Sequence, residues 1–507
     1  MQQGTLQRAM GALALMTWAG SAFATLGCDD VKTFLAHRAT GLLCFHSDDL
    51  RTNNPVTTPP DNSITTFANG QTLPGFAAGF GSYTPTKDRG VISNAPAPSD
   101  GPVPGLQVEG WFADDATFQA RFVLRFPDTW NGRLVVAGAS GTRSEYNGDW
   151  AWSDYVLSRH YAYASQNKGV LNFWISSLSS PTQPDAQSCR VNPPPGGLSQ
   201  LWVHFYDIDP AKPFTQWTQY MLETASLAQD AAKAAYRQAP RYTYAVGTSN
   251  GGYQVRRAME TAPNLFDGGV DWEGTYIDPT ENILVDLPTA VKNLPDYVAS
   301  NYDPASAAAQ NIVAAGYPPD IVQRDLAGNV TASLWQKYFI DFWEVTACQW
   351  QLRFDPSYAT YTAGVANYDY LARLTPAVAA QVAAVTTTGK IKKPLITVAG
   401  TMDALLPIKH QARAYEAAVN ASRKGNNDHR NAQYRLYEVQ NGNHIEAYAL
   451  TFPQLQLIQP YAQRSFDLLV AHVESNAALP PSQCIPKDGV IAQAPAQPGN
   501  CASLLAP

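Results

Sequence analysis

The stretch Gly247-Thr248-Ser249-Asn250-Gly251 decides how this chain is interpreted. It fits the pattern G-x-S-x-G, in which a serine stands on a sharp strand-to-helix turn with its hydroxyl held clear of the backbone. Glycines suit such a turn because the backbones approach too closely for side chains. Residues 242–246 have the pattern of a short buried strand, and residues 252–262 that of a helix that ends before Pro263. This context predicts that Ser249 is a nucleophile.

Strand and helix patterns alternate around this motif. Strand patterns occur at 106–112, 118–126, 133–137, 161–165, 268–272, 394–399 and 434–439, and helical spacing occurs at 216–238, 409–420 and 460–475. Such alternation predicts an α/β fold with a mostly parallel sheet and helices on both faces. Residues 275–390 interrupt the alternation with helical patches and aromatic residues. They are therefore expected to form a large insertion, either a lid that shapes substrate entry or a packing domain without a function.

This pattern divides the chain into five parts. We expect a signal peptide over residues 1–24 and a core in two parts, 25–274 and 391–478. The lid domain is expected over 275–390, and a Pro/Ala-rich tail over 479–507 is expected to lie on the surface.

The first 24 residues are typical of a secretory signal peptide. Arg8 is their only charge, residues 9–20 are apolar, and Ala22-Phe23-Ala24 fits an A-x-A cleavage site. The apolar run is too short to span a bilayer. We therefore expect a secreted or periplasmic protein. The alternatives are a buried N-terminal helix and, as a variant of export, lipidation at Cys28.

Composition narrows the range of partners. The 507 residues carry a formal net charge of −7 without a basic stripe, which argues against nucleic acid as a partner. No other apolar run is long enough to span a membrane. We therefore expect a small-molecule substrate, no membrane span and no cofactor.

The six cysteines predict disulfides, because their number is even and the chain is expected to be exported. They allow 15 pairings. Spacing favours Cys28–Cys44 and Cys484–Cys501 as local bridges and leaves Cys189–Cys348 as a longer one. None has the C-x-x-C spacing that is common in zinc sites, so no metal site is expected.

A serine needs a base to accept its proton and an acid to orient that base. In folds with this turn, the partners follow the serine in the order acid, then histidine. Asp403 and His444 fit, because each follows a predicted strand and would lie at the same sheet edge as Ser249. Asp403 could instead be a helix-capping residue and His444 an ordinary surface residue. Asp271 is the second candidate for the acid, and Glu273 follows it.

The reaction also needs hydrogen-bond donors for an oxyanion. One expected donor is the backbone N–H of Asn250, directly after the nucleophile. The other is expected from the loop after residues 133–137, at Ala139 or Ser140, although an ordinary tight turn would show the same residues.

Several segments resemble the tannase and feruloyl esterase family of α/β-hydrolases. They are Trp130-Asn131-Gly132-Arg133-Leu134 with residues 136–138, Tyr163-Ala164-Ser165-Gln166-Asn167-Lys168-Gly169, residues 247–252 and residues 263–269. The resemblance implies an α/β-hydrolase core, the acid and base at Asp403 and His444, and a lid selective for aromatic acyl groups. Aromatic lid residues are then expected to line the acyl pocket, with Trp335, Phe339 and Trp343 as candidates.

The chain departs from that family at one pair of positions. The family usually has cysteines directly before the serine and after the histidine, which form a disulfide, whereas this chain has Thr248 and Ile445. No run of Asp in the lid resembles the calcium site of some relatives. A fainter resemblance is to exported 3-hydroxybutyrate-oligomer hydrolases, whose turn can also read S-N-G-G.

The sequence therefore predicts an exported serine esterase that hydrolyses carboxylic esters, of aromatic acids in the first place, through an acyl-enzyme. The alternative substrate is an oligomer of 3-hydroxybutyrate or a related polyester. A catalytically silent binding protein is a third hypothesis, and nothing marks a peptide-binding subsite of a peptidase.

Overall fold

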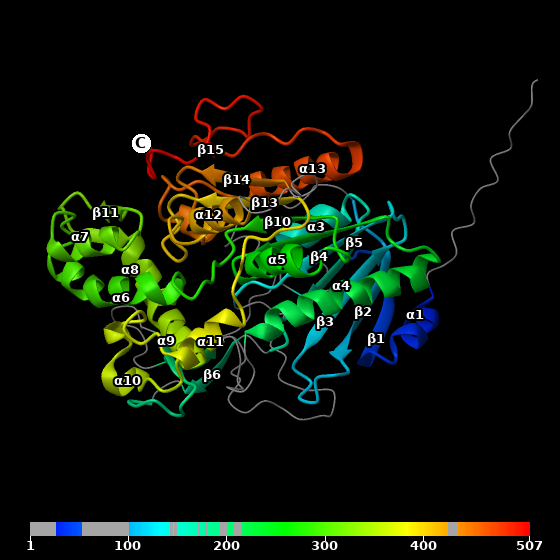
Figure 1. Ribbon diagram of the computed structural model, residues 1–507, viewed down its shortest axis with the longest axis horizontal. Coiled ribbons are helices and arrows are strands. Elements are labelled where there is room, and N and C mark those ends of the chain that lie inside the picture. The colour runs from blue at the N-terminus through cyan, green and yellow to red at the C-terminus, as the bar shows by residue number, and fades with distance from the viewer. Residues whose placement is uncertain are drawn as a thin grey trace, which may run out of the picture.

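The computed structural model describes residues 27–52, 101–141, 145–146, 150–170, 173–177, 180–191, 201–205, 214–423 and 433–507. A large sheet forms the centre of the molecule, and a group of helices lies at one end of it (Figure 1). The predicted signal peptide, residues 1–24, lies outside the described residues.

The large sheet has ten strands and is mostly parallel, as predicted. Its strands, in spatial order, are β1 (Ala39–Ser47), β2 (Gly105–Phe112), β3 (Arg121–Pro127), β5 (Ala162–Gln166), β4 (Arg133–Gly138), β9 (Tyr242–Thr248), β10 (Gly268–Trp272), β13 (Leu395–Gly400), β14 (Tyr434–Val439) and β15 (Gln483–Ile485). The pairs from β1 to β5 are antiparallel, and every pair from β5 to β15 is parallel. The predicted strands agree with these bounds except at their ends.

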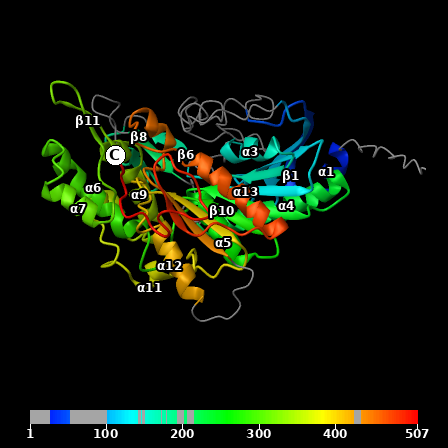
Figure 2. The same cartoon turned by 90° about the horizontal axis from the view of Figure 1, so that it is seen from above.

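Helices cover both faces of the sheet (Figure 2). One face packs on α1 (Cys28–Leu35), α4 (Thr215–Tyr236), α5 (Asn250–Thr261) and α12 (Ala412–Arg423), and the other on α3 (Trp150–Leu157) and α13 (Gln459–Ser475). Alternation along β4 explains this: Leu134 and Val136 belong to the first core, and Val135 and Ala137 to the second. The central strands are therefore apolar on both sides.

The segment between β10 and β13, residues 275–390, is the helical insertion. It contains α6 (Ile283–Ala299), α7 (Ala307–Ala314), β11 (Val322–Arg324), β12 (Val330–Ser333), α8 (Leu334–Tyr338), the π-helix η1 (Phe339–Trp343), α9 (Glu344–Phe354), α10 (Thr360–Ala363), the 3₁₀-helix η2 (Val365–Asn367) and α11 (Pro376–Ala383). Its buried side chains form a third core, which extends to Leu405, Leu406 and Tyr448 in the loops beyond β13 and β14. The insertion is thus packed onto the sheet edge where these strands end.

The three disulfides pair as the spacing predicts: Cys28–Cys44, Cys189–Cys348 and Cys484–Cys501. Cys189 lies in β7 (Cys189–Val191), part of a small sheet with β6 (Phe173–Ser177) and β8 (Leu201–Phe205), while Cys348 lies in α9. This bridge therefore fastens the helical insertion to a segment from the first half of the chain.

The C-terminal tail lies largely at the surface, as expected, and the Cys484–Cys501 bridge ties it. It also joins the large sheet, because the buried residues 483–485 form β15, which pairs with β14. The last residues also bind loops at the sheet edge: the N–H of Ala506 donates to Asn441 Oδ1 at 2.7 Å, and Thr401 Oγ1 donates to the carbonyl of Leu504. A Pro/Ala-rich composition did not reveal these backbone contacts.

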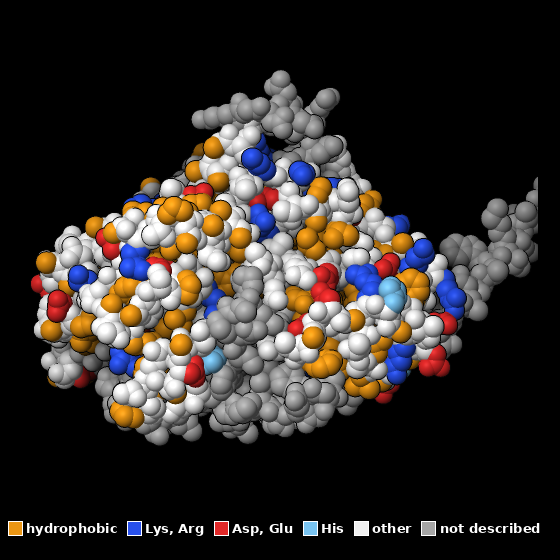
Figure 3. Space-filling view, turned by 60° about the horizontal axis from the view of Figure 1, so that its bottom comes forward, with side chains coloured by type: hydrophobic (Ala, Val, Ile, Leu, Met, Phe, Trp, Pro, Cys, Tyr) orange, Lys and Arg blue, Asp and Glu red, His pale blue; other side chains and the backbone are white. Residues whose placement is uncertain are grey.

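Acidic and basic side chains are intermixed on the face shown in Figure 3. Among the residues described, no helix has both the length and the apolar character that crossing a bilayer requires.

Removal of the Cys189–Cys348 bridge is predicted to destabilise the protein by about 2–5 kcal/mol, because the bridge restricts a long loop in the unfolded chain. Its cysteines are 159 residues apart. The test is urea unfolding of the Cys189→Ala/Cys348→Ala variant. The control is Cys28→Ala/Cys44→Ala, whose cysteines are 16 residues apart and whose removal should cost less. A larger loss in the control would contradict the prediction.

Candidate functional site

Ser249 occupies the turn between β9 and α5 in a conformation that few residues adopt. Its φ is 59° and its ψ is −123°, outside the regions that an L-residue ordinarily prefers. Hydrogen bonds hold it there: its N–H donates to the carbonyl of Trp272 at 2.9 Å, and its carbonyl accepts from the N–H of Tyr253 at 3.1 Å. Strain of this kind concentrates at functional sites. Ser249 as a whole residue is 9% exposed.

The two glycines of the motif permit this turn. A Cβ on Gly247 would lie 2.4 Å from the carbonyl oxygen of Gly251, and a Cβ on Gly251 would lie 2.3 Å from that of Gly138. Any side chain at either position would displace backbone. Glycine at these positions therefore brings the end of β4 against the first turn of α5.

Four neighbouring parallel strands each carry a polar residue just beyond their carboxyl ends. Ser249 follows β9, Glu273 follows β10, Asp403 follows β13 and His444 follows β14. Parallel strands end at one edge, so these four residues lie along the same side of the sheet. Among the described residues, Ser249 and His444 do not form a hydrogen bond with each other. In many enzymes the hydrogen bond between nucleophile and base shortens only when substrate is bound.

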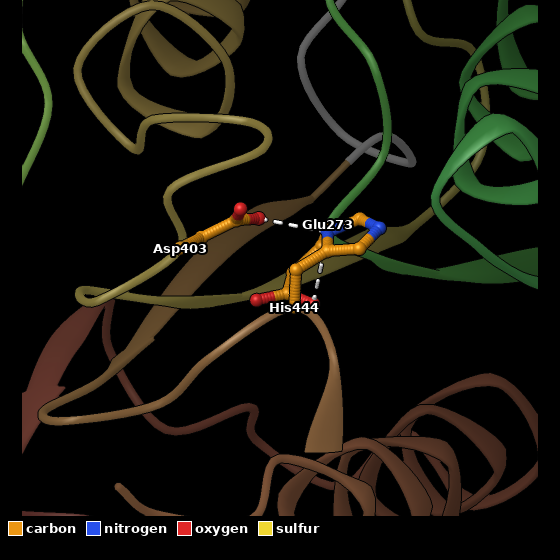
Figure 4. Close-up of side chains that lie close together, drawn as sticks. All are labelled: Glu273, Asp403 and His444. Atoms are coloured by element: carbon orange, nitrogen blue, oxygen red, sulfur yellow. Dashed lines mark hydrogen bonds and ion pairs between the residues drawn. The ribbon is translucent and has the colours of Figure 1, made fainter. Parts of the chain in front are cut away.

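Asp403 and His444 are joined directly. The Nδ1 atom of His444 lies 2.8 Å from Asp403 Oδ2, as Figure 4 shows. The other carboxylate oxygen, Oδ1, accepts the N–H groups of Leu405 at 2.8 Å and Leu406 at 2.7 Å. Asp403 is 1% exposed and His444 8%. A buried acid held this way fixes the orientation of the imidazole and leaves its Nε2 to act as a base.

Glu273 completes the cluster, and sequence reasoning gave it no role. Its Oε2 lies 3.5 Å from the same Nδ1 of His444, and its Oε1 accepts the N–H of Gly400 at 3.0 Å. Glu273, Asp403 and His444 are also a possible set of metal ligands. A metal bound to Nδ1 and Oδ2 at about 2.0–2.2 Å would hold those atoms roughly 3.3 Å apart in a tetrahedral site, so 2.8 Å fits a hydrogen bond better.

Asp271, the second candidate for the acid, contacts other groups. It is fully buried, and its Oδ2 accepts from Arg256 Nε at 2.6 Å and from Thr397 Oγ1 at 2.8 Å. Its Oδ1 accepts the N–H of Gly274 at 2.7 Å. Asp271 therefore connects α5 to the sheet. The carboxylate that faces His444 is that of Glu273.

The loop after β4 carries the expected oxyanion donors Ala139 and Ser140. Ser140 Oγ donates to the carbonyl of Thr248 at 2.9 Å, which fastens this loop to the serine turn. The ammonium of Lys168 donates to the carbonyls of Ser140 and Gly141, the latter at 2.9 Å. The loop thus holds one expected donor, at Ala139 or Ser140. The other, the N–H of Asn250, belongs to the first turn of α5, whose N–H groups have no acceptor within the helix. Whether these N–H groups bind an oxyanion stays a prediction.

The helical insertion contacts the loops of Asp403 and His444. Trp343 Nε1 donates to the carbonyl of Ala404 at 2.7 Å. The hydroxyl of Tyr338 donates to Asn443 Oδ1 at 2.8 Å, next to His444. Burial and the charge of Asp403 raise the pKa of Tyr338 well above its ordinary value, so the hydroxyl stays a donor.

The three aromatic candidates for substrate binding lie close to these contacts. Trp335 and Trp343 are buried in the core of the insertion, and Phe339 packs against that core half-buried. Phe339 to Trp343 form a π-helix, a distortion that is frequent at functional sites. The role of these three residues in substrate binding stays a prediction. The structure shows in addition that Trp343 holds the Asp403 loop through its hydrogen bond to Ala404.

Comparison with known proteins bears out both resemblances that the sequence suggested. A family model described as 3HB-oligomer hydrolase matches residues 350–503, which include Asp403 and His444. D-(-)-3-hydroxybutyrate oligomer hydrolase of Burkholderia thailandensis is 39% identical over 112 residues, 21% of this chain and 15% of that protein. The protein of the same description from Burkholderia mallei strain SAVP1 is 40% identical over 111 residues, 20% of this chain and 15% of its own. The chain thus matches only a small part of these relatives' length.

Comparison with solved structures covers a larger share of this chain than the sequence matches do. Feruloyl esterase B from Aspergillus oryzae has a TM-score of 0.50 and 12% sequence identity, over 89% of this chain and 91% of that one. Tannin acyl hydrolase from Aspergillus niger has a TM-score of 0.47 and 10% identity, over 74% and 80%. Together with the strand order, the likeness to the feruloyl esterase establishes the predicted α/β-hydrolase fold.

Asp271→Asn is predicted to destabilise the fold by about 3–5 kcal/mol, because it leaves the buried Arg256 guanidinium without its counter-charge. The measurement is the free energy of unfolding in urea. Asp230→Asn serves as the control, since Asp230 forms a partly exposed ion pair with Arg38 and its loss should cost less than about 1 kcal/mol. Equal losses in the two variants would show that the Asp271–Arg256 pair is not the support described above.

Proposed function

We propose that this protein is an exported serine hydrolase of carboxylic esters, with Ser249 as nucleophile, His444 as base and Asp403 as the acid that orients the base. The Asp403–His444 hydrogen bond of 2.8 Å, at the edge that also carries the strained Ser249, is the observation that carries the proposal. The three disulfides fit an oxidising compartment and so support export.

The reaction follows from these contacts. His444 Nε2 accepts the proton of Ser249 Oγ while Oγ bonds to the ester carbonyl carbon, and the Asp403 carboxylate stabilises the imidazolium that results. The tetrahedral intermediate places its oxyanion near the N–H of Asn250 and the loop of Ala139 and Ser140. His444 returns the proton to the leaving alcohol, which departs and leaves an acyl-enzyme.

Water releases the acid by the same steps. His444 takes a proton from the water that attacks the acyl carbonyl, a second oxyanion forms, and the carboxylic acid leaves as Ser249 Oγ regains its proton. Lys168 contributes by holding the carbonyls of Ser140 and Gly141, so the donor loop does not have to reorganise during the reaction.

Oligomers of 3-hydroxybutyrate or of a related hydroxy acid are the first substrate class to test. The family match over residues 350–503 supports this choice, because that region carries two of the three proposed catalytic residues. The aromatic esters that the sequence motifs suggested are the second class. Of the three aromatic candidates for the acyl pocket, Phe339 is the one that is only half-buried.

Ser249→Ala is predicted to lower kcat/KM for any ester substrate by about 10⁴-fold or more, because no other group replaces the nucleophile. Hydrolysis of p-nitrophenyl acetate gives the rate. Ser422→Ala, which changes a serine on α12, should keep the rate of the parent protein. Near-parental turnover by a correctly folded Ser249→Ala variant would remove Ser249 from the mechanism.

A matched panel separates the two substrate classes. We expect the protein to release 3-hydroxybutyrate from its dimer and trimer faster than it hydrolyses methyl ferulate or methyl gallate. Liquid chromatography of the products at equal enzyme concentration measures both. The reverse order would move the assignment to aromatic esters, and inactivity on all of these together with p-nitrophenyl acetate would favour a binding protein.

A further inference from the structure

Two carboxyl groups, rather than one, face the Nδ1 atom of His444. Asp403 Oδ2 lies 2.8 Å from it and Glu273 Oε2 lies 3.5 Å from it. In Figure 4 both contacts meet at the same ring nitrogen, and the other ring nitrogen points away from both acids. The two acids come from different strands, since Glu273 follows β10 and Asp403 follows β13.

Glu273 is held in this place. Its φ is 52°, an uncommon conformation that lets the chain turn directly after β10. Its N–H donates to the carbonyl of Val398 at 2.8 Å, and its Oε1 accepts the N–H of Gly400 at 3.0 Å. Oε2 is buried and forms no hydrogen bond of ordinary geometry among the described residues, although it faces His444 and the Trp272 side chain lies close enough to lower the pKa of Glu273. An acceptor that is buried without a donor calls for an explanation.

We infer that Glu273 is a positioning residue for the same reaction: it shares the Nδ1 side of His444 with Asp403 and orients the imidazole in place of Asp403 when that carboxylate is lost. The inference rests on the proposed hydrolase function. It assigns the acid role to a pair of residues on adjacent strands rather than to one residue.

The charges around Glu273 explain why Asp403 holds the closer position. Burial and the neighbouring charge of Asp403 raise the pKa of Glu273 well above its ordinary value, and Glu446 adds to this effect. Both causes disfavour the charged form of Glu273, so the imidazole hydrogen bond goes to Asp403. Without Asp403 its repulsion is absent, and Glu273 Oε2, which already faces Nδ1, is the carboxyl oxygen left to accept the Nδ1–H of His444.

Four proteins test this inference: the parent, Glu273→Gln, Asp403→Ala and the double variant. Glutamine keeps the shape and the acceptor for the Gly400 N–H but cannot become an anion. We expect kcat to fall less than about 10-fold in Glu273→Gln and about 10- to 100-fold in Asp403→Ala, with KM little changed. In the double variant it should fall about 10⁴-fold, the loss typical of a histidine without its acid.

The matched control is Asp403→Ala/Glu446→Gln. Glu446 is also a buried carboxylate near the site, but its Oε1 accepts the N–H groups of Ile458 and Gln459. This variant should keep at least the kcat of Asp403→Ala, because losing the charge of Glu446 only relieves repulsion on Glu273. Equal kcat values for Asp403→Ala and for the double variant with Glu273→Gln would overturn the inference.

A readout without substrate separates this inference from the proposed function. The Nδ1–H proton of His444 gives a downfield NMR signal, assigned by its absence in His444→Gln. We expect the signal to persist in Asp403→Ala and to vanish when Glu273→Gln is added; its loss in Asp403→Ala alone would contradict the inference. If no ester is turned over but the signal behaves as expected, only the proposed function fails.

Should Asp403→Ala not fold, Asp403→Ser replaces it in these experiments, because the serine hydroxyl still offers an acceptor to the Leu405 N–H.

Discussion

The parallel alignment of β9, β10, β13 and β14 is the constraint on which the site depends. Parallel strands must end at the same edge, so the residues that follow them are brought together although they are far apart in the chain. Ser249 and His444 are separated by almost two hundred residues, yet only two strands lie between the strands that carry them. The helical insertion between β10 and β13 then lengthens the chain without disturbing this order.

The loops at that edge are fixed from several directions. The insertion holds the Asp403 loop through Trp343 and the His444 loop through Tyr338. The C-terminal residues hold the same loops from another side, through Asn441 and Thr401. Two further anchors are the Lys168 contact with the Ser140 loop and the Cys189–Cys348 bridge. The proposed reaction needs this support, because a displacement of a catalytic group by about 1 Å would disrupt the geometry for proton transfer.

This network takes the place of the disulfide that proteins of the tannase and feruloyl esterase family, which this chain resembles, usually have beside the serine and histidine. Thr248 and Ile445 occupy those positions, and both still take part in binding neighbouring loops through their backbones. The carbonyl of Thr248 accepts from Ser140 Oγ, and the N–H of Ile445 lies 3.4 Å from the hydroxyl of Tyr338. Hydrogen bonds thus connect the turn of Ser249 and the loop of His444 to the rest of the molecule.

Local signals in the sequence predicted much of the fold and of the candidate site. The Gly-rich turn, the apolar strands before it and after it, and the spacing of the cysteines depend on short stretches, and each has a clear physical cause. Glu273 was missed as a partner of His444 because only the three-dimensional turn decides which of two nearby acids faces the histidine: Asp271 turns toward Arg256 instead. The β15 pairing was missed because three residues carry too weak a pattern, and the burial of Trp335 and Trp343 depends on tertiary packing.

The most direct test of the account is to find the residue that reacts as the nucleophile with a fluorophosphonate, which forms a P–O bond to it as fluoride leaves. The protein should be treated with a fluorophosphonate, digested and analysed by mass spectrometry, in parallel with His444→Gln. We predict one adduct, on the peptide that contains Ser249, formed rapidly in the parent protein and far more slowly without His444. An adduct on another residue, or equal labelling of Ser249 in both proteins, would contradict the claim that His444 activates Ser249.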